Sequence, residues 1–209
     1  MRISVLIRKW LLLVFVVGAF FPVISHQETF HGRVVPSPHL NLLVVEVVRG
    51  YAPYIDFCRR NPTECDMTGP EVVAFDTSVE QALRLVNKEV NNEIVFTLDR
   101  DQYGVEEYWN YPSTGQGDCE DMALEKRARL VRKEFPRGAL RLAIVLHRER
   151  LSSHCILTVE TTAGTYVLDT FLDLISVWHE APYYFESRER NDGQWERFDQ
   201  GVWYSGSHE

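Results

Sequence analysis

The spacing of apolar residues along the chain predicts helices in its first half and strands in its second. The first amphipathic stripe recurs every three or four residues, as on one buried face of a helix, and consists of Val79, Leu83, Val86 and Val90. Residues 77–80 read Thr-Ser-Val-Glu, the pattern of a capping box. We therefore expect a helix that begins at Thr77 and ends near Asn91 and Asn92.

A second helix is predicted directly after residue 118. Its stripe has the same spacing and consists of Leu124, Ala128, Val131 and Phe135. A polar, glycine-bearing loop, residues 113–117, comes before it. With Asp118 as the N-cap, Cys119 is the first helical residue and lies among the unpaired N–H groups of the first turn. Because the helix dipole favours negative charge there, we expect a thiolate, the reactive form of cysteine, at Cys119.

The second half of the chain is rich in strand patterns. Aliphatic runs predict strands at residues 140–147, 154–160 and 165–170, with a turn at 161–164 between the last two. The aromatic segments 183–185 and 195–198 are expected to add edge strands. Residues 42–48 form an apolar run whose pattern fits either a strand or a short helix.

The N-terminus has the features of a targeting segment. Arg2, Arg8 and Lys9 precede a continuous apolar run over residues 10–21. We interpret residues 1–27 as a signal peptide or, alternatively, as an uncleaved anchor in the inner membrane. Either interpretation predicts a domain in the periplasm or outside the cell. Residues 28–50 are then a linker or extended arm, 51–200 the folded domain and 201–209 a loose tail.

The composition is that of an ordinary globular protein, with 45% hydrophobic and 25% charged residues among 209. The formal net charge is −8, and no basic cluster is present that could bind phosphates. These features argue against nucleic acid as a partner.

The chain has four cysteines, which is informative for an exported protein. Cys58 and Cys65 flank Pro62, so we expect them to form a local disulfide. A metal site there is less favoured, because no further cysteine or histidine lies nearby at zinc spacing. An exported protein rarely leaves a thiol unpaired without a use, which makes Cys119 a candidate nucleophile.

The predicted hairpin brings a histidine and an acid together. If residues 162–163 form a two-residue turn, His154 and Asp169 lie on the same face as diagonal neighbours, and a three-residue turn would place them opposite each other. Cys155 then points to the other face, as a buried core thiol. A cysteine nucleophile works with a histidine that takes its proton and an acceptor that orients the ring. Cys119, His154 and Asp169 are therefore predicted to form a catalytic triad.

These residues lie in segments that resemble a known family. Residues 115–123 (Gly-Gln-Gly-Asp-Cys-Glu-Asp-Met-Ala), 154–159 and 167–169 resemble the bacterial transglutaminase-like cysteine proteinases, whose LapG-like members are periplasmic proteases. The resemblance extends from about Tyr51 to Phe198. It implies an α+β fold of the papain-like or transglutaminase-like type, in which a cysteine-bearing helix packs on an antiparallel sheet that carries the histidine and the acid.

The resemblance also implies the roles of several residues. It makes Cys119 the nucleophile, His154 the general base and then acid, and Asp169 the orienting group. It implies calcium bound through Asp118 and Glu120, and a surface adhesin as substrate. The chain departs from the family pattern at Met122, where tyrosine is usual, and at Thr170, where asparagine is common.

Calcium also has a physical argument of its own. Asp118, Glu120 and Asp121 put carboxylates beside the nucleophile, where they would oppose thiolate formation. A hard cation with oxygen ligands would offset that charge. The alternative is that these acids only complement the helix N-terminus and face water.

The sequence favours an exported cysteine peptidase that cleaves a periplasmic or cell-surface protein through an acyl-enzyme. The oxyanion would be held by the backbone N–H of Cys119, with Gln116 or Trp109 as a second donor. Two alternatives remain open. A transglutaminase-type acyl transferase would use the same triad, and a binding module would retain an idle one. Trp109 and Tyr111 are expected to be core or platform residues.

Overall fold

A computed structural model of the chain describes residues 37–199. The predicted targeting segment 1–27, the first part of the expected linker and the tail 201–209 lie outside the described residues. Within the described range, no helix is both long and apolar enough to cross a membrane.

The central feature is a seven-stranded sheet in which every neighbouring pair is antiparallel. The strand order is β1-β9-β8-β4-β5-β6-β7. The strands are β1 (Val44–Val48), β4 (Leu140–His147), β5 (Ser153–Thr161), β6 (Gly164–Leu168), β7 (Ser176–Val177), β8 (Tyr183–Glu189) and β9 (Trp195–Phe198). A separate parallel pair joins β2 (Val95–Phe96) to β3 (Gln116–Gly117).

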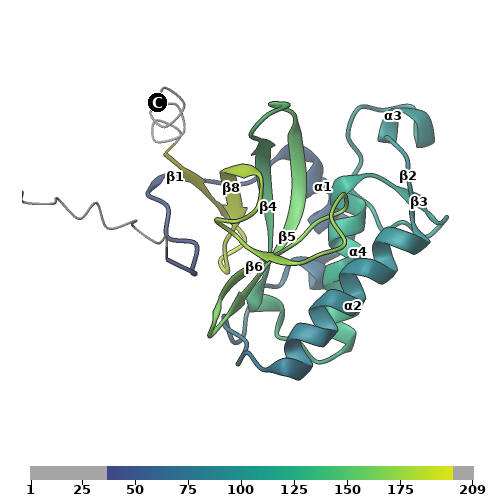
Figure 1. The fold of residues 1–209 in the computed structure, drawn as a ribbon. Coiled ribbons are helices and arrows are strands. Elements are labelled where there is room, and N and C mark those ends of the chain that lie inside the picture. The colour runs from purple at the N-terminus through teal and green to yellow at the C-terminus, as the bar shows by residue number, and fades with distance from the viewer. Residues whose placement is uncertain (1–36, 200–209) are drawn as a thin grey trace, which may run out of the picture. The chain divides into compact units, whose positions relative to one another are not determined.

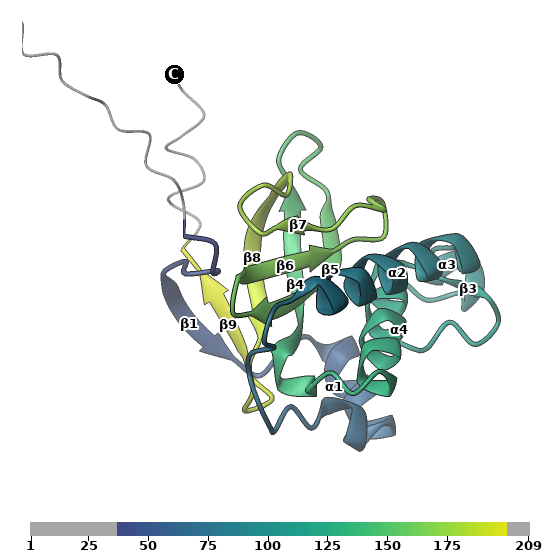
Figure 2. The same cartoon turned by 60° about the horizontal axis from the view of Figure 1, so that its bottom comes forward.

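The longer helices lie together against this sheet. They are α1 (Ala52–Arg60), α2 (Thr77–Glu93) and α4 (Cys119–Arg132), and the short ones are α3 (Asp99–Gln102) and two 3-10 turns at Pro62–Cys65 and Arg137–Ala139. Helices α2 and α4 run side by side, and α4 contacts β5 (Figures 1 and 2). The predicted α+β fold, with the cysteine-bearing helix on an antiparallel sheet, is confirmed.

Helix α2 begins where the sequence predicts, but a different residue caps it. Asp76, not Thr77, is the N-cap, and its Oδ1 accepts a hydrogen bond of 2.8 Å from the Val79 N–H. The helix continues to Glu93, so Asn91 lies inside it. A carboxylate one residue upstream of the expected cap provided the better acceptor for the unpaired N–H groups.

Helix α4 begins at Cys119 with Asp118 as its N-cap, although the Asp118 side chain makes no capping hydrogen bond. Leu124 of the predicted stripe is fully buried, whereas Ala128 and Val131 are half-buried. The helix also buries two cationic side chains, Lys126 and Arg127, completely. More residues of this helix are therefore buried than its apolar stripe predicts.

The hairpin of β5 and β6 has the predicted register. Thr161 pairs with Gly164, which is the two-residue turn expected at residues 162–163. The ambiguous run at 42–48 contains strand β1, so part of the expected linker belongs to the sheet. The prediction that 183–185 and 195–198 are edge strands is wrong: β8 and β9 lie inside the sheet, and β1 and β7 form its edges. Sequence periodicity reports which side chains are buried and gives no order of strands.

A buried ion pair joins the helix that bears Cys119 to the middle of the sheet. Arg127 Nη1 of α4 lies 2.6 Å from Glu189 Oε2 of β8, and neither side chain is exposed. The Glu189 carboxylate also accepts hydrogen bonds from the Tyr54 hydroxyl and the Leu142 N–H. This network fixes α4 against β8, because each charged or polar group depends on the others for its partners.

Candidate active site

The loop before α4 has a glycine for a steric reason. A Cβ at Gly117 would lie 2.8 Å from the Asp121 Cβ and 3.1 Å from the Pro112 Cβ, so no larger residue fits there. Asp121 is fully buried, and its Oδ1 accepts a hydrogen bond of 2.7 Å from the Asn110 N–H. Asp121 thus ties residues 109–111 to the first turn of α4, and Gly117 permits that packing.

The Cys119 thiol lies between the helix start and strand β5. Its Sγ accepts a hydrogen bond of 3.3 Å from the Cys155 N–H and donates one of 3.2 Å to Glu120 Oε2. Burial and the adjacent Glu120 carboxylate raise the pKa of the Cys119 thiol well above its ordinary value. This direction is opposite to the one that the helix dipole predicts, and its main cause is the burial of the sulfur.

His154 and Asp169 form a buried pair on the face of β5 and β6 that the hairpin register predicts. His154 Nε2 lies 2.7 Å from Asp169 Oδ1. The Phe171 N–H donates to the same Oδ1 at 3.0 Å, and the Tyr183 hydroxyl donates to Oδ2. Burial alone would raise the pKa of Asp169, but the hydrogen bonds from His154 and Tyr183 lower it overall. The acid therefore stays ionised beside the imidazole.

The Cys119 sulfur contacts strand β5 at the residue next to His154. Cys155, whose N–H binds the Cys119 sulfur, directly follows His154 in β5. Within residues 37–199, the hydrogen bonds of the thiol go to Glu120 and Cys155 and not to the His154 ring. The three predicted triad residues thus lie in one region, with the thiol turned toward Glu120.

Two asparagines of α2 hold the loop that carries Asp169. Asn91 Nδ2 donates 2.9 Å to the Asp169 carbonyl oxygen, and Asn87 Nδ2 donates 2.7 Å to that of Leu172. Both side chains point from α2 toward residues 169–173. The sequence pattern assigned Asn91 to the end of the helix and gave no sign of this contact.

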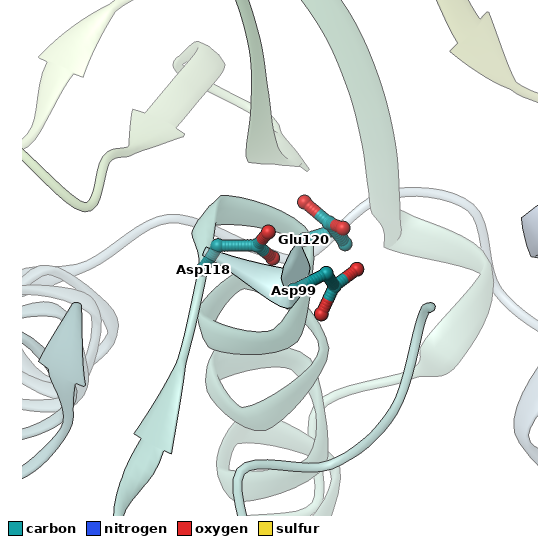
Figure 3. A group of neighbouring side chains, drawn as sticks. All are labelled: Asp99, Asp118 and Glu120. Atoms are coloured by element: carbon teal, nitrogen blue, oxygen red, sulfur yellow. The ribbon is translucent and has the colours of Figure 1, made fainter. Parts of the chain in front are cut away.

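An acidic cluster lies at the start of α4, formed by Asp99, Asp118 and Glu120 (Figure 3). One carboxylate oxygen of each lies within 4.8 Å of the others, and all three residues are buried. Burial together with neighbouring carboxylates raises the pKa of Asp118 to about 6 and that of Glu120 to about 10. Asp121 points elsewhere, to the Asn110 N–H. The cluster therefore contains the predicted pair, adds Asp99 and leaves out Asp121.

A family model completes this picture. The model of the bacterial transglutaminase-like cysteine proteinases matches residues 45–202. The chain belongs to this family. It is a cysteine-type peptidase, a hydrolase that acts on protein. A comparison with curated proteins found no match.

Solved structures agree with the fold of this proteinase. Calcium-bound LapG of Legionella pneumophila matches with a TM-score of 0.50 and 23% identity, over 59% of this chain and 74% of that one. EGTA-treated LapG of the same organism matches with a TM-score of 0.51 and 19% identity, over 72% of this chain and 81% of that one. At these identities, the likeness concerns the fold.

The remaining expectations about this proteinase concern its cysteines and aromatics. Cys58 and Cys65 are joined by a disulfide, and Cys155 is a free, buried thiol. Trp109 is 3% exposed and packs edge-on against Tyr54, so its ring belongs to the core. Because the Trp109 ring is buried in the core, it is the poorer candidate for a second oxyanion donor. Gln116 is exposed and is the better candidate.

Asp99 is the member of the acidic cluster that the sequence did not predict. It begins the short helix α3, and its Oδ2 accepts a hydrogen bond from the Tyr108 N–H. A lone acid in a mixed segment carries no periodic pattern, and only the folded chain brings it to Asp118. Its complete burial is what distinguishes it from the exposed Asp101 nearby.

Proposed function

We propose that the protein is an exported cysteine peptidase that uses Cys119, His154 and Asp169 as a catalytic triad. The observation that carries this proposal is the buried His154–Asp169 pair, 2.7 Å apart, next to the position where the Cys119 sulfur meets β5. Membership of the cysteine proteinase family supports it as well. Such a pair can hold an imidazole in one orientation and stabilise the imidazolium that forms during proton transfer.

The hydrogen bond of the His154 ring determines which of its nitrogens acts as the base. Nε2 of His154 binds Asp169, so Nδ1 is the nitrogen that takes the thiol proton of Cys119. For this step, the thiol turns from Glu120 toward the ring. The sulfur then attacks the peptide carbonyl carbon, the C–N bond breaks, and His154 gives its proton to the leaving amine. Water, deprotonated by His154, attacks the acyl-enzyme and releases the acid product and free Cys119.

The oxyanion needs donors at the helix start. The N–H of Cys119 belongs to the first turn of α4, where backbone donors have no partner within the helix. The Gln116 amide is the proposed second donor, because its side chain is exposed and its strand leads directly to Cys119.

The acidic cluster is the proposed calcium site. Asp99 Oδ1, Asp118 Oδ1 and Glu120 Oε1 are buried and lack a hydrogen-bond partner among the described residues, so three oxygen ligands are available to a hard cation. A LapG structure described as calcium-bound supports the choice of metal. When bound, calcium would neutralise these carboxylates and fix the loop that carries Cys119. Binding can be tested by titration calorimetry on the full protein, with Asp99→Ala as the variant that should lose it.

The proposed location is the periplasm or the cell surface. The basic and apolar residues of 1–27 support export, and so does the Cys58–Cys65 disulfide, because such bonds persist in oxidising compartments. The proposed substrate is then a periplasmic or surface protein, for which an adhesin is one class. Cell fractionation and the N-terminal sequence of the mature protein test export and distinguish a cleaved signal peptide from an anchor.

The activity itself is tested with the wild-type protein and the Cys119→Ala variant on a peptide mixture with calcium, analysed by mass spectrometry. Shortened peptides from wild type only would support the proposal. Cleavage by the alanine variant would refute Cys119 as nucleophile. Products joined to an added amine, without shortened acids, would favour acyl transfer. No product of either kind from the folded protein with calcium present would favour a binding module.

A further inference from the structure

Two exposed aromatic rings lie directly beside the proposed triad. The ring of Phe171 stacks on His154, with centroids 4.8 Å apart and planes at 24°. Phe96 packs against Phe171 with centroids 5.3 Å apart. Phe171 is 55% exposed and Phe96 is 42% exposed, whereas His154, on which Phe171 stacks, is buried. Large apolar side chains gathered at the surface beside a reactive centre are typical of a binding surface.

The two rings come from the two halves of the site. Phe96 belongs to β2, which pairs with β3, and β3 leads directly into Cys119. Phe171 follows Asp169, and its N–H donates to the Asp169 carboxylate. The Phe96–Phe171 contact therefore joins the segment that leads to the nucleophile to the loop that orients the histidine.

The proposed mechanism indicates which part of the substrate lies near these rings. The attacked carbonyl lies at the Cys119 sulfur, and the leaving amine receives its proton from His154. The residue that contributes that amine, directly C-terminal to the cleaved bond, must therefore lie on the histidine side of the site. Phe171 is the exposed side chain that stacks on the His154 ring.

We infer that Phe96 and Phe171 form a subsite for a large apolar side chain on the residue directly after the cleaved bond. The inference rests on the proposed function and adds the chemical class of substrate residue that this site prefers. An apolar side chain laid on the rings removes its own surface and theirs from water, whereas a carboxylate would lose hydration without a partner. We expect a preference of about tenfold for leucine, methionine or phenylalanine over aspartate or glutamate.

The experiment uses the full protein with calcium and a mixture of synthetic peptides of varied sequence, with mass spectrometry to identify the residue after each cleaved bond. The main variant is Phe96→Glu, because Phe96 packs on Phe171 and leaves the His154–Asp169 pair untouched. It should lose the apolar preference and select lysine and arginine instead. Val47→Glu is the matched control, since Val47 is 44% exposed on the edge strand β1 and should keep the wild-type profile.

A second pair of variants separates the apolar contact from the fold of the loop. Phe171→Leu keeps an apolar side chain and the backbone N–H, and should keep the preference. Phe171→Ala should lose it. Wild-type cleavage without apolar enrichment, or an unchanged profile in Phe96→Glu, would overturn the subsite and leave the proposed function standing. If wild type cleaves no peptide although iodoacetamide labels Cys119, the proposed function fails and the subsite fails with it.

Discussion

Replacement of Asp169 by asparagine tests how the histidine is oriented. Both His154 Nε2 and the Phe171 N–H bind the same oxygen, Oδ1, while the Tyr183 hydroxyl binds Oδ2. A backbone N–H can only donate, so the atom at the Oδ1 position must be an acceptor. In Asp169→Asn, we therefore expect the amide oxygen at Oδ1 and the NH₂ group toward the Tyr183 oxygen, which can accept. His154 Nε2 still donates, and Nδ1 remains the base.

The expected fall in kcat/KM of Asp169→Asn follows from the loss of the carboxylate charge alone. A hydrogen bond to an ionised group contributes about 1.5–3 kcal/mol, and a neutral one about 0.5–1.5 kcal/mol. The midpoints of these ranges differ by about 1.2 kcal/mol, which corresponds to a fall of about eightfold in kcat/KM for Asp169→Asn. Asp169→Ala leaves the buried Phe171 N–H and the His154 ring without their acceptor. At about 4 kcal/mol for these losses together, it should reduce kcat/KM by about a thousandfold.

The assay measures kcat/KM of both variants on one peptide that the wild-type protein cleaves, with circular dichroism to verify that each variant folds. Thr170→Ala is the neighbouring control, because its side chain is half-buried and should matter little. If Asp169→Asn is as inactive as Asp169→Ala, the amide presents NH₂ to His154, and the argument that Phe171 dictates the orientation is wrong.

Three further outcomes are expected. Gln116→Ala should lower kcat about a hundredfold with KM little changed, if its amide stabilises the oxyanion; an equal rise in KM alone would contradict this role. Calcium at a hundred times its dissociation constant should stabilise the wild-type protein by about 2.7 kcal/mol in thermal denaturation, and Asp99→Ala should abolish this shift; an equal shift in the variant would exclude the acidic cluster. Glu189→Gln should cost about 3–5 kcal/mol in urea denaturation, because Arg127 stays buried without its counter-charge. The exposed Glu46→Gln should cost about 0.5 kcal/mol or less, and similar costs for both would contradict the buried network.

Local pattern predicted the elements that carry the site. Helical spacing together with a polar loop identified Cys119 as the first residue of α4, and the turn at 162–163 predicted the register that brings His154 to Asp169. Both features depend on residues close in sequence, since one is a helix start and the other a two-residue hairpin. Such geometry follows from capping and from the two-residue period of strands.

Features that depend on contacts between residues far apart in the sequence were not predicted. Asp99 joins Asp118 only because α3 folds back onto the start of α4, and Asn91 reaches the Asp169 carbonyl across two elements. The raised pKa of Cys119 was missed for a related reason: the helix start was recognised, but the burial that opposes ionisation comes from the packed sheet. Periodicity describes one element at a time, and none of these contacts lies within one element.

The central claim is that Cys119 forms a covalent acyl-enzyme with the help of His154. The most direct measurement is mass spectrometry of the intact protein, quenched in acid during cleavage of a peptide in the presence of calcium. The account predicts a mass increase equal to the N-terminal half of the peptide, located on Cys119, that is absent in Cys119→Ala and forms far more slowly in His154→Ala. Peptide cleavage without any adduct on Cys119, or an adduct that forms equally fast in His154→Ala, would contradict it.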